Sequence, residues 1–493
     1  MSRSIYFRKS GKSPRWSKKK KATSDILWAR KPDDLPDARL KKMSFNLFAA
    51  CTGPANGLCD VNEHLPSALI TDINWNSKNR KAYGVSESLY EKHPISGKIT
   101  GEPVADSYAI VARKDNALLV VADGVNWGEK SMKAARSAIY GVVRYVCQNL
   151  FTESQVFKTK ELFKVLRSSV DAAHQVILET QGGLTTLCVA FVAPLSNSKQ
   201  FAICIVNVGD SLGYVFSRHH GIREITTASH DITVERNIRD ARGAIGPVRG
   251  NDPDLANLTC SMTFCDAGDI VFLTTDGVSD NFDPVVTKVA VAPKQTRSKS
   301  DSDAPIENGE EFTSVAYECG IAQDGRPEMT PSERHQYAVK EMERIIHEQE
   351  LETEQSISAQ ELCASIILHV VKLTEKRRRI LENPQVWKKL KSEEAKKKRD
   401  DAVREKLRAE PGKLDHATIV AYEIGVFQGN ENENYEEESD HELVLCSSPG
   451  YGDYTAPIAQ FDSFESESEQ ETTTTLKDDE SDSISQKFEE FVV

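Results

Sequence analysis

The sequence predicts an α+β domain in which antiparallel β-sheets are layered against helices. Short apolar runs rich in β-branched and aromatic residues recur along the chain and are separated by polar, turn-forming linkers. Two long segments with helical spacing lie among these runs, so helices do not alternate regularly with strands. This order favours paired antiparallel strands covered by helices over a parallel array of strand–helix–strand units. With 39% apolar residues in 493, the chain can bury a substantial core.

The folded region opens with a hairpin and two helices. The apolar runs at 107–112 and 117–121 are joined by four polar residues, which is typical of a β-hairpin. The segment after Gly128 then places apolar residues at a helical period. These residues are Met132, Ala135, Ile139, Val142, Val143 and Val146. A second helix is predicted at about residues 160–178.

The rest of the folded region is a series of strands followed by helices. Strands are predicted at 184–195, 199–211, 212–218, 258–264 and 269–274, and a last one at 414–424. Between them, residues 335–350 and 358–374 have helical patterns, and Ser358 with Glu361 forms a capping-box signature at the start of the second. Residues 376–408 are dense in both charges and are predicted to be one solvated helix.

These patterns divide the chain into three regions. Residues 1–80 are basic and aperiodic and are interpreted as a largely disordered arm and lead-in; the run Lys18–Lys21 also suits nuclear import or nucleic-acid binding. Residues 81–424 form the folded domain, with a long loop or disordered insertion at about 286–334. Residues 425–493 are acidic, rich in Ser and Thr, and expected to lack fixed structure.

Composition narrows the classes of protein and of partner. Ten cysteines without a CxxC pair or a Cys/His zinc spacing favour free thiols in a reducing compartment. No secretory signal is recognisable and no apolar run approaches about 18 residues. We therefore expect a monomer in the cytoplasm, the nucleus or both, without membrane association. The mixed signs of the charged helix argue against nucleic acid, whereas the two charged tails suit protein partners.

Two apolar strands of this chain stop at an Asp-Gly pair. They end at Asp123-Gly124 and at Asp276-Gly277, and two further aspartates, Asp106 and Asp415, also lie at strand ends. One Asp-Gly is more often a plain turn, but the repeated pattern predicts that carboxylates converge at a sheet edge. Two such charges about 4 Å apart repel by about 4 kcal/mol at an effective dielectric of about 20.

Raised pKa values or bound cations would relieve this repulsion. Carboxylates, a backbone carbonyl and water suit Mg²⁺ or Mn²⁺ better than zinc, and the missing side chain of Gly124 would let its carbonyl approach an ion. Two such ions can activate a water molecule and bind an anionic substrate. The hydrolysis of a phosphate ester is therefore the reaction that this pattern predicts.

Five motifs in order resemble the metal-dependent serine/threonine phosphatases of the PPM type, also called protein phosphatase 2C. They are VADGV (121–125), GGLTT (182–186), NVGDS (207–211), FLTTDGVSDN (272–281) and LDHATIV (414–420). The resemblance covers roughly residues 81–285 and 335–424. It implies an α-β-β-α sandwich of two antiparallel sheets flanked by helices. It also implies direct hydrolysis of phosphoserine and phosphothreonine in phosphoprotein substrates, with a water activated by two Mn²⁺ or Mg²⁺ ions.

The resemblance also implies roles for individual residues. Asp123 would bridge two metal ions, the Gly124 carbonyl would bind one of them, and Asp276 and Asp415 would complete the binuclear site. Asp106 would occupy the position that orients the metal-bound water, and Asp210 would stand near a third, looser ion. Without the resemblance, Asp415 reads as a plain strand start followed by an exposed His416.

The chain departs from the family pattern at three positions. Ala105 replaces the usual glutamate before Asp106, Val125 replaces a histidine proposed as general acid, and Gly101 lies near the position of a phosphate-binding arginine. The cations considered as replacements are Arg80, Arg113, Lys130 and Arg242. These departures leave a second interpretation open, in which the chain is a weak or inactive pseudophosphatase that acts as a metal-stabilised scaffold or adaptor.

Overall fold

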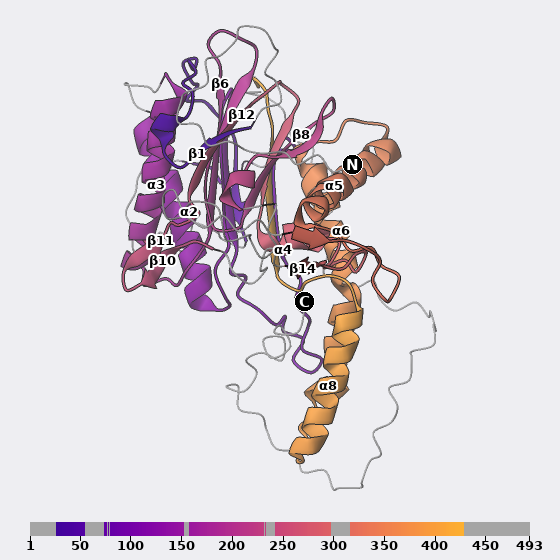
Figure 1. Ribbon diagram of the computed structural model, residues 1–493. Coiled ribbons are helices and arrows are strands. Elements are labelled where there is room, and N and C mark those ends of the chain that lie inside the picture. The colour runs from indigo at the N-terminus through magenta and orange to yellow at the C-terminus, as the bar shows by residue number, and fades with distance from the viewer. Residues whose placement is uncertain are drawn as a thin grey trace, which may run out of the picture.

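The computed structural model describes residues 26–54, 73–75, 77, 79–151, 157–230, 232, 242–296 and 316–427. Two antiparallel sheets pack face to face, and helices cover the outer face of each (Figure 1). This confirms the α+β class that the sequence predicts and the α-β-β-α sandwich that the family resemblance implies. Of the expected basic arm and lead-in at 1–80, residues 1–25, 55–72, 76 and 78 lie outside the described residues, as do residues 428–493 of the expected acidic tail at 425–493.

The two large sheets contain seven and five strands. The first has the order β1 (Leu27–Ala29), β12 (Thr259–Cys265), β7 (Phe201–Val208), β6 (Leu187–Pro194), β5 (Ala117–Ala122), β4 (Ser107–Arg113) and β2 (Leu47–Gly53). The second has the order β3 (Ala82–Ser88), β16 (His416–Glu423), β13 (Ile270–Thr274), β8 (Leu212–Ser217) and β9 (Gly221–Glu224). Two small hairpins add β10 (Ala244–Arg249) with β11 (Asp252–Asp254), and β14 (Lys294–Thr296) with β15 (Ala316–Glu318).

Helices α2 (Glu129–Leu150) and α3 (Thr159–Glu179) cover the first sheet, close to the predicted positions. On the other side, α5 (Pro331–Thr353) and α6 (Ala359–Leu381) cover the second sheet (Figure 1). The short α4 (Asp276–Ser279) follows β13 directly. Within the described residues, no helix is both long and apolar enough to cross a membrane.

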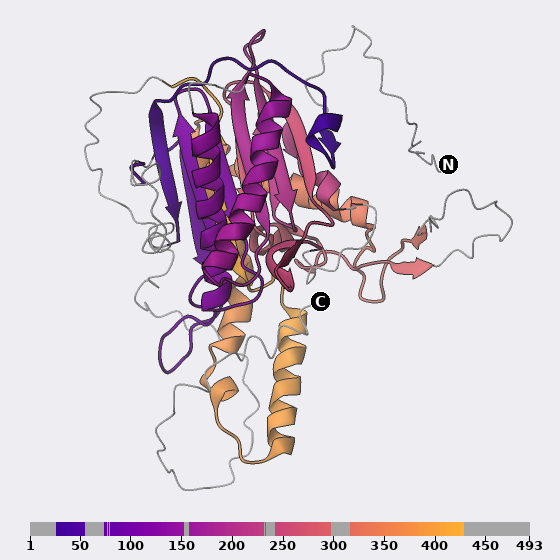
Figure 2. The same cartoon turned by 90° about the vertical axis from the view of Figure 1, so that its left-hand side faces the viewer.

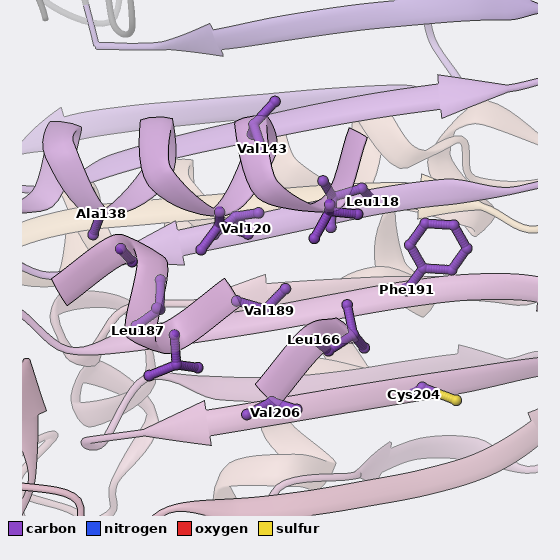
Figure 3. Packing of buried hydrophobic residues seen from close by; sticks show 14 of the residues in the cluster. Leu118, Val120, Ala138, Val143, Leu166, Leu187, Val189, Phe191, Cys204 and Val206 are labelled. Carbon is purple, nitrogen blue, oxygen red and sulfur yellow. The ribbon is translucent and has the colours of Figure 1, made fainter. Parts of the chain in front are cut away.

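The unbroken apolar run of β5 is explained by its position between two cores. Leu118 and Val120 point toward α2 and α3, as Figure 3 shows for the outer core, whereas Leu119 and Val121 belong to the core between the sheets. Successive side chains of a strand point to opposite faces. A strand that is buried on both faces therefore needs apolar residues at every position.

The fold begins earlier in the chain than the sequence suggested. Strands β1 and β2 precede Lys81, the expected start of the folded region, and they form the two edges of the first sheet. β1 has three residues and its Trp28 is half exposed, so it has little apolar periodicity to detect. Its stability comes from antiparallel pairing with β12, which is more than 200 residues away in the chain.

The prediction of one helix at 376–408 is wrong. The first residues of this segment complete α6, and α7 (Pro384–Trp387) and α8 (Glu393–Ala409) follow. Together these helices form a hairpin that extends beyond one end of the sandwich (Figures 1 and 2). Pro384 lacks a backbone N–H, and the residue before a proline disfavours the helical conformation, so the helix ends there. The side chain of Asn383 caps α7 by accepting a hydrogen bond from the Gln385 N–H.

The capping box at the start of α6 is present, as predicted. Ser358 Oγ accepts a hydrogen bond from the Glu361 N–H, and the Glu361 carboxylate accepts one from the Ser358 N–H at 2.8 Å. We expect Ser358→Ala to destabilise the protein by about 1 kcal/mol because it removes one half of this pair. Calorimetry should show a melting temperature about 2–4 °C lower. Ser358→Thr keeps the hydroxyl and should melt close to wild type; equal losses in both variants would contradict a role for the cap.

Candidate active site

The ends of four strands bring the predicted aspartates together. Because β4 and β5 pair with Ser107 opposite Ala122, Asp106 and Asp123 flank the same end of the first sheet. Asp276 follows β13 and Asp415 precedes β16, its antiparallel neighbour in the second sheet. A hydrogen bond between the sheets closes the group, since Thr275 Oγ1 donates to Asp106 Oδ2 at 2.8 Å. The sandwich thus gathers carboxylates from both sheets at one end.

The motif GGLTT holds the backbone of Asp123. Thr185 Oγ1 donates to the Asp123 carbonyl at 2.8 Å, and Thr186 Oγ1 accepts a hydrogen bond from the Asp123 N–H at 3.1 Å. Thr186 Oγ1 is also 2.8 Å from Ser211 Oγ, next to the buried Asp210. The motifs VADGV, GGLTT and NVGDS therefore meet at one place, which their positions in the sequence did not show.

Asp106 and Asp123 share an electrostatically strained environment. Burial, and then the charges of Asp106, Asp276, Asp415 and Asp210, raise the pKa of Asp123 well above its ordinary value. Burial, and then the charge of Asp415, likewise raise the pKa of Asp106, which is 1% exposed. In the described structure Asp106 Oδ1 is buried without a hydrogen-bond partner. Buried polar atoms are normally paired, so this oxygen is suited to a cation or a proton.

Gly124 is required by packing as well as by any role of its carbonyl. A Cβ at this position would lie 2.5 Å from the carbonyl oxygen of Ser131 and 2.7 Å from that of Ala105. Both are backbone atoms and cannot easily move away. The sequence offered only the approach of an ion as the reason for this glycine. Binding of a metal ion by the Gly124 carbonyl stays a prediction.

Lys413, a cation at the centre of this group, was not predicted from the sequence. Its ammonium lies 2.7 Å from Asp276 Oδ2, 2.9 Å from Asp415 Oδ2 and 3.0 Å from Asp280 Oδ2. Burial alone would lower the pKa of Lys413, but these three carboxylates together raise it well above its ordinary value. Its spacing from Asp415 was the available signal, because residues i and i+2 of an extended segment share a face.

Asp415 is fixed by contacts on both of its oxygens. Oδ1 accepts hydrogen bonds from the His416 N–H at 2.8 Å and from Tyr90 Oη at 3.3 Å, while Oδ2 faces Lys413. Tyr90 in turn accepts a hydrogen bond from Trp127 Nε1 at 2.8 Å. Trp127 is half-buried and packs with the apolar cluster of the α6–α8 hairpin, so this hairpin is connected to the site.

His416 is buried, whereas the plain strand-start interpretation placed it in solvent. Its Nε2 is 2.8 Å from the Gly101 carbonyl oxygen, and its Nδ1 accepts a hydrogen bond from the Ala105 N–H at 3.3 Å. These contacts assign the neutral tautomer that is protonated on Nε2, and burial lowers the pKa of the imidazole. His416 therefore holds the loop that leads into Asp106. Glu102, in the same loop, is exposed.

Two of the arginines considered as phosphate-binding replacements are engaged elsewhere. Arg80 forms an ion pair with Glu361 at 2.6 Å on the outer helix layer. Arg113 lies at the far end of β4 from Asp106, with its guanidinium over the Phe151 ring. Lys130 is exposed at the start of α2, and Arg242 is half-buried with a left-handed backbone. Lys413 is the cation that the structure places directly against the aspartates.

The residues fit a divalent cation at one side of the group better than at the other. Within the described residues, no three His, Cys, Asp or Glu side chains are arranged as a formed metal site. Asp276 and Asp415 already face the Lys413 ammonium, whereas no ion pair joins Lys413 to Asp106 or Asp123 in the described chain. The oxygen-only donors at the Asp123 side, including the unpartnered Asp106 Oδ1, suit a hard ion such as Mg²⁺ or Mn²⁺.

Comparisons with known proteins bear on the family of this chain. The family model described as protein phosphatase 2C matches residues 96–301. The chain is 37% identical over 456 residues to the PP2C-like domain-containing protein CG9801 of Drosophila melanogaster. That match includes 76% of this chain and spans 64% of the relative's length.

The chain also has remote similarity to solved structures. One is a phosphatase from a pathogenic strain of Toxoplasma gondii, at 10% identity and a TM-score of 0.38, covering 71% of this chain and 95% of that one. Another is the catalytic domain of the serine threonine protein phosphatase PstP in complex with two manganese ions, at 15% identity and a TM-score of 0.31, covering 69% and 96%. On the family model and the Drosophila relative, the chain belongs to the PPM-type, or protein phosphatase 2C, family of phosphatases.

Proposed function

We propose that this protein is a metal-dependent phosphatase that hydrolyses phosphoserine and phosphothreonine in other proteins. The observation that carries the proposal is the convergence of Asp106, Asp123, Asp276 and Asp415 from two different sheets. A fold gains nothing in stability from gathering like charges, since each pair repels by on the order of 1–4 kcal/mol. Such a group is typical of a functional site.

The chain provides the ligands that Mn²⁺ or Mg²⁺ prefers. Asp123 and the Gly124 carbonyl would hold an ion, Asp276 and Asp415 complete the predicted set, and Asp210 stands close enough to influence the pKa of Asp123. When bound, such an ion lowers the pKa of a water molecule and neutralises charge that develops on the phosphoryl group.

Asp106 is the residue best suited to handle a proton in this reaction. In the metal-free chain, burial and the charge of Asp415 raise its pKa, so this carboxyl holds a proton more readily than an ordinary aspartate does. Thr275 fixes one oxygen by a hydrogen bond, which leaves Oδ1 for the reacting group. Val125 cannot donate a proton to the departing hydroxyl group, so we expect turnover to be slow for the family.

The wider biology proposed for the chain follows from its charge and composition. We propose that it acts as a monomer on phosphoproteins in the cytoplasm or nucleus. Its basic segment at 1–25 and its acidic segment from residue 428 would bind protein partners. Neither a membrane nor a nucleic acid is needed for the proposed activity.

The full chain should release phosphate from phosphothreonine and phosphoserine peptides when Mn²⁺ is added, and a chelator should stop the release. A phosphotyrosine peptide of the same sequence is the matched control and should be a poor substrate. Hydrolysis that persists in chelator would contradict the metal mechanism. No hydrolysis at saturating Mn²⁺ or Mg²⁺ would favour the scaffold interpretation instead.

A further inference from the structure

We propose that Lys413 takes the place of one of the two divalent ions, so that the site binds a single ion, on its Asp123 side. This inference rests on the proposed metal-dependent function and specifies how that site is filled. It begins from the three carboxylates around one ammonium, those of Asp276, Asp280 and Asp415, at 2.7–3.0 Å. An ion at the same oxygens would have to displace this side chain or share its position with a like charge.

The position of Lys413 is built into the backbone. The buried Asn281 side chain contacts it in both directions: Oδ1 accepts from the Lys413 N–H at 2.7 Å, and Nδ2 donates to the Lys413 carbonyl at 3.0 Å. Asn281 Nδ2 also donates to the Gly277 carbonyl at 2.7 Å, next to Asp276. The lysine and the aspartate that it neutralises are therefore held by one amide, and the lysine side chain is only 14% exposed.

The turn before the lysine is equally specific. Gly412 has a backbone φ of +93°, and a Cβ there would lie 2.8 Å from Thr374 of α6. Its N–H donates to the Val286 carbonyl at 3.0 Å, which ties the turn to the segment after α4. Few side chains adopt this conformation without strain. The turn thus directs the next residue into the carboxylates, as expected for a cation with a fixed role.

The two sides of the site are filled differently. The ammonium contacts Asp276, Asp280 and Asp415, while Asp106 Oδ1 is buried with no hydrogen-bond partner in the described chain. One positive charge is thus already fixed beside the carboxylates of the second sheet, Asp276 and Asp415. The carboxylates of the first sheet, Asp106 and Asp123, have uncompensated negative charge. A divalent ion gains most where no cation stands nearby, so it should bind at Asp123, beside Asp106. A second ion would be opposed by the ammonium.

The test counts ions instead of measuring turnover. Equilibrium dialysis of the full chain with Mn²⁺, read by electron paramagnetic resonance, should give one tightly bound ion per wild-type chain. Lys413→Gln should bind two, because removal of the ammonium exposes Asp276 and Asp415. Lys413→Arg keeps the charge and should remain at one. Asp280→Asn is the matched control for loss of a lysine contact, and should also remain at one.

Two tightly bound ions in the wild type would overturn the inference, as would no binding or an unchanged count in Lys413→Gln. If that variant folds poorly, the numbers of Mn²⁺ ions bound by the wild type and by Lys413→Arg still test the inference, because each is expected to be one. A separate phosphopeptide assay keeps the two proposals apart. Hydrolysis together with two bound ions in the wild type would support the phosphatase activity and refute the proposed role of Lys413. One bound ion without hydrolysis would support the role of Lys413 and refute the phosphatase activity.

Discussion

Asp123→Asn is expected to abolish phosphatase activity and, in the same protein, to raise the melting temperature of the metal-free form at pH 8. The loss of activity follows from the removal of a charged ligand. The gain in stability follows from the environment of Asp123, whose pKa is raised by burial and by the charges of Asp106, Asp276, Asp415 and Asp210. Asparagine has a similar shape but is uncharged, so the neighbouring carboxylates do not repel it as they repel the carboxylate of Asp123.

The direction of the pH effect can be stated from the raised pKa values. The folded protein binds protons at Asp123 and Asp106 more readily than the unfolded chain does. The stability that this protonation contributes is fully present below the unfolded pKa of about 3.9. It is lost as the pH rises through the higher, folded values. The difference between Asp123→Asn and wild type should therefore be small in acid and should grow toward pH 8.

Calorimetry in chelator at several pH values measures this difference. Each like-charge pair costs on the order of 1–4 kcal/mol, so the variant should melt about 3 °C or more above wild type at pH 8. With Mn²⁺ the order should reverse, because only the wild type gains from the ion. Asp252→Asn, on the exposed β10–β11 hairpin, is the control and should change neither curve. A metal-free Asp123→Asn that melts lower than wild type at pH 8 would contradict this account.

The parts of the fold that the sequence predicted are those whose cause is local. The β4–β5 hairpin was identified from two apolar runs and a four-residue polar linker, and its register alone places Asp106 beside Asp123. The α2 and α3 helices followed from apolar spacing, and the α6 start from its capping box. Such signals act within a few residues, so a single sequence is enough to detect them.

The parts that were missed depend on distant partners or on a signal that was overlooked. β1 is a strand only because β12 pairs with it, and nothing within its three residues shows this. Tyr90 reaches Asp415 across more than 300 residues of chain. The break before α8 is different, because Pro384 marks it plainly and the charge pattern was given more weight.

The residues of the candidate site were likewise predicted only in part. The aspartates were identified because most of them lie at strand ends, with the roles of Asp415 and Asp210 given only by the family resemblance. The ammonium that lies between Asp276 and Asp415 was not identified. Lysine is usually a surface residue, and the spacing of Lys413 from Asp415 shows only that the two side chains share a face, not that the lysine is buried. The reason for its burial lies in Asn281 and Gly412, whose contacts exist only in the folded chain. Composition and spacing cannot show how a charge is neutralised.

Gly277→Ala is expected to be one of the most damaging single changes in this domain. Gly277 lies in α4, directly after Asp276, and its backbone does not need the left-handed conformation. Alanine in a helix is ordinarily more stable than glycine by about 1 kcal/mol. Here, however, the added Cβ would lie 2.0 Å from the His416 carbonyl oxygen and 3.1 Å from the Asp415 Cβ. Both contacts are with the start of β16, which is fixed by its pairing with β13 and β3.

The clash can be relieved only by moving α4 away from β16, which separates Asp276 from Asp415 and from Lys413. We expect a loss of more than about 3 kcal/mol in the free energy of unfolding, at the upper end of the cost of overpacking a core. Denaturant unfolding measures the loss. Gly320→Ala is the matched control, because its Cβ would meet nothing nearer than 3.7 Å, and it should stay within about 0.5 kcal/mol of wild type. If Gly277→Ala were as stable as this control, α4 and β16 could not be packed as closely as the structure shows, and the placement of Asp276 beside Asp415 would fall with that packing.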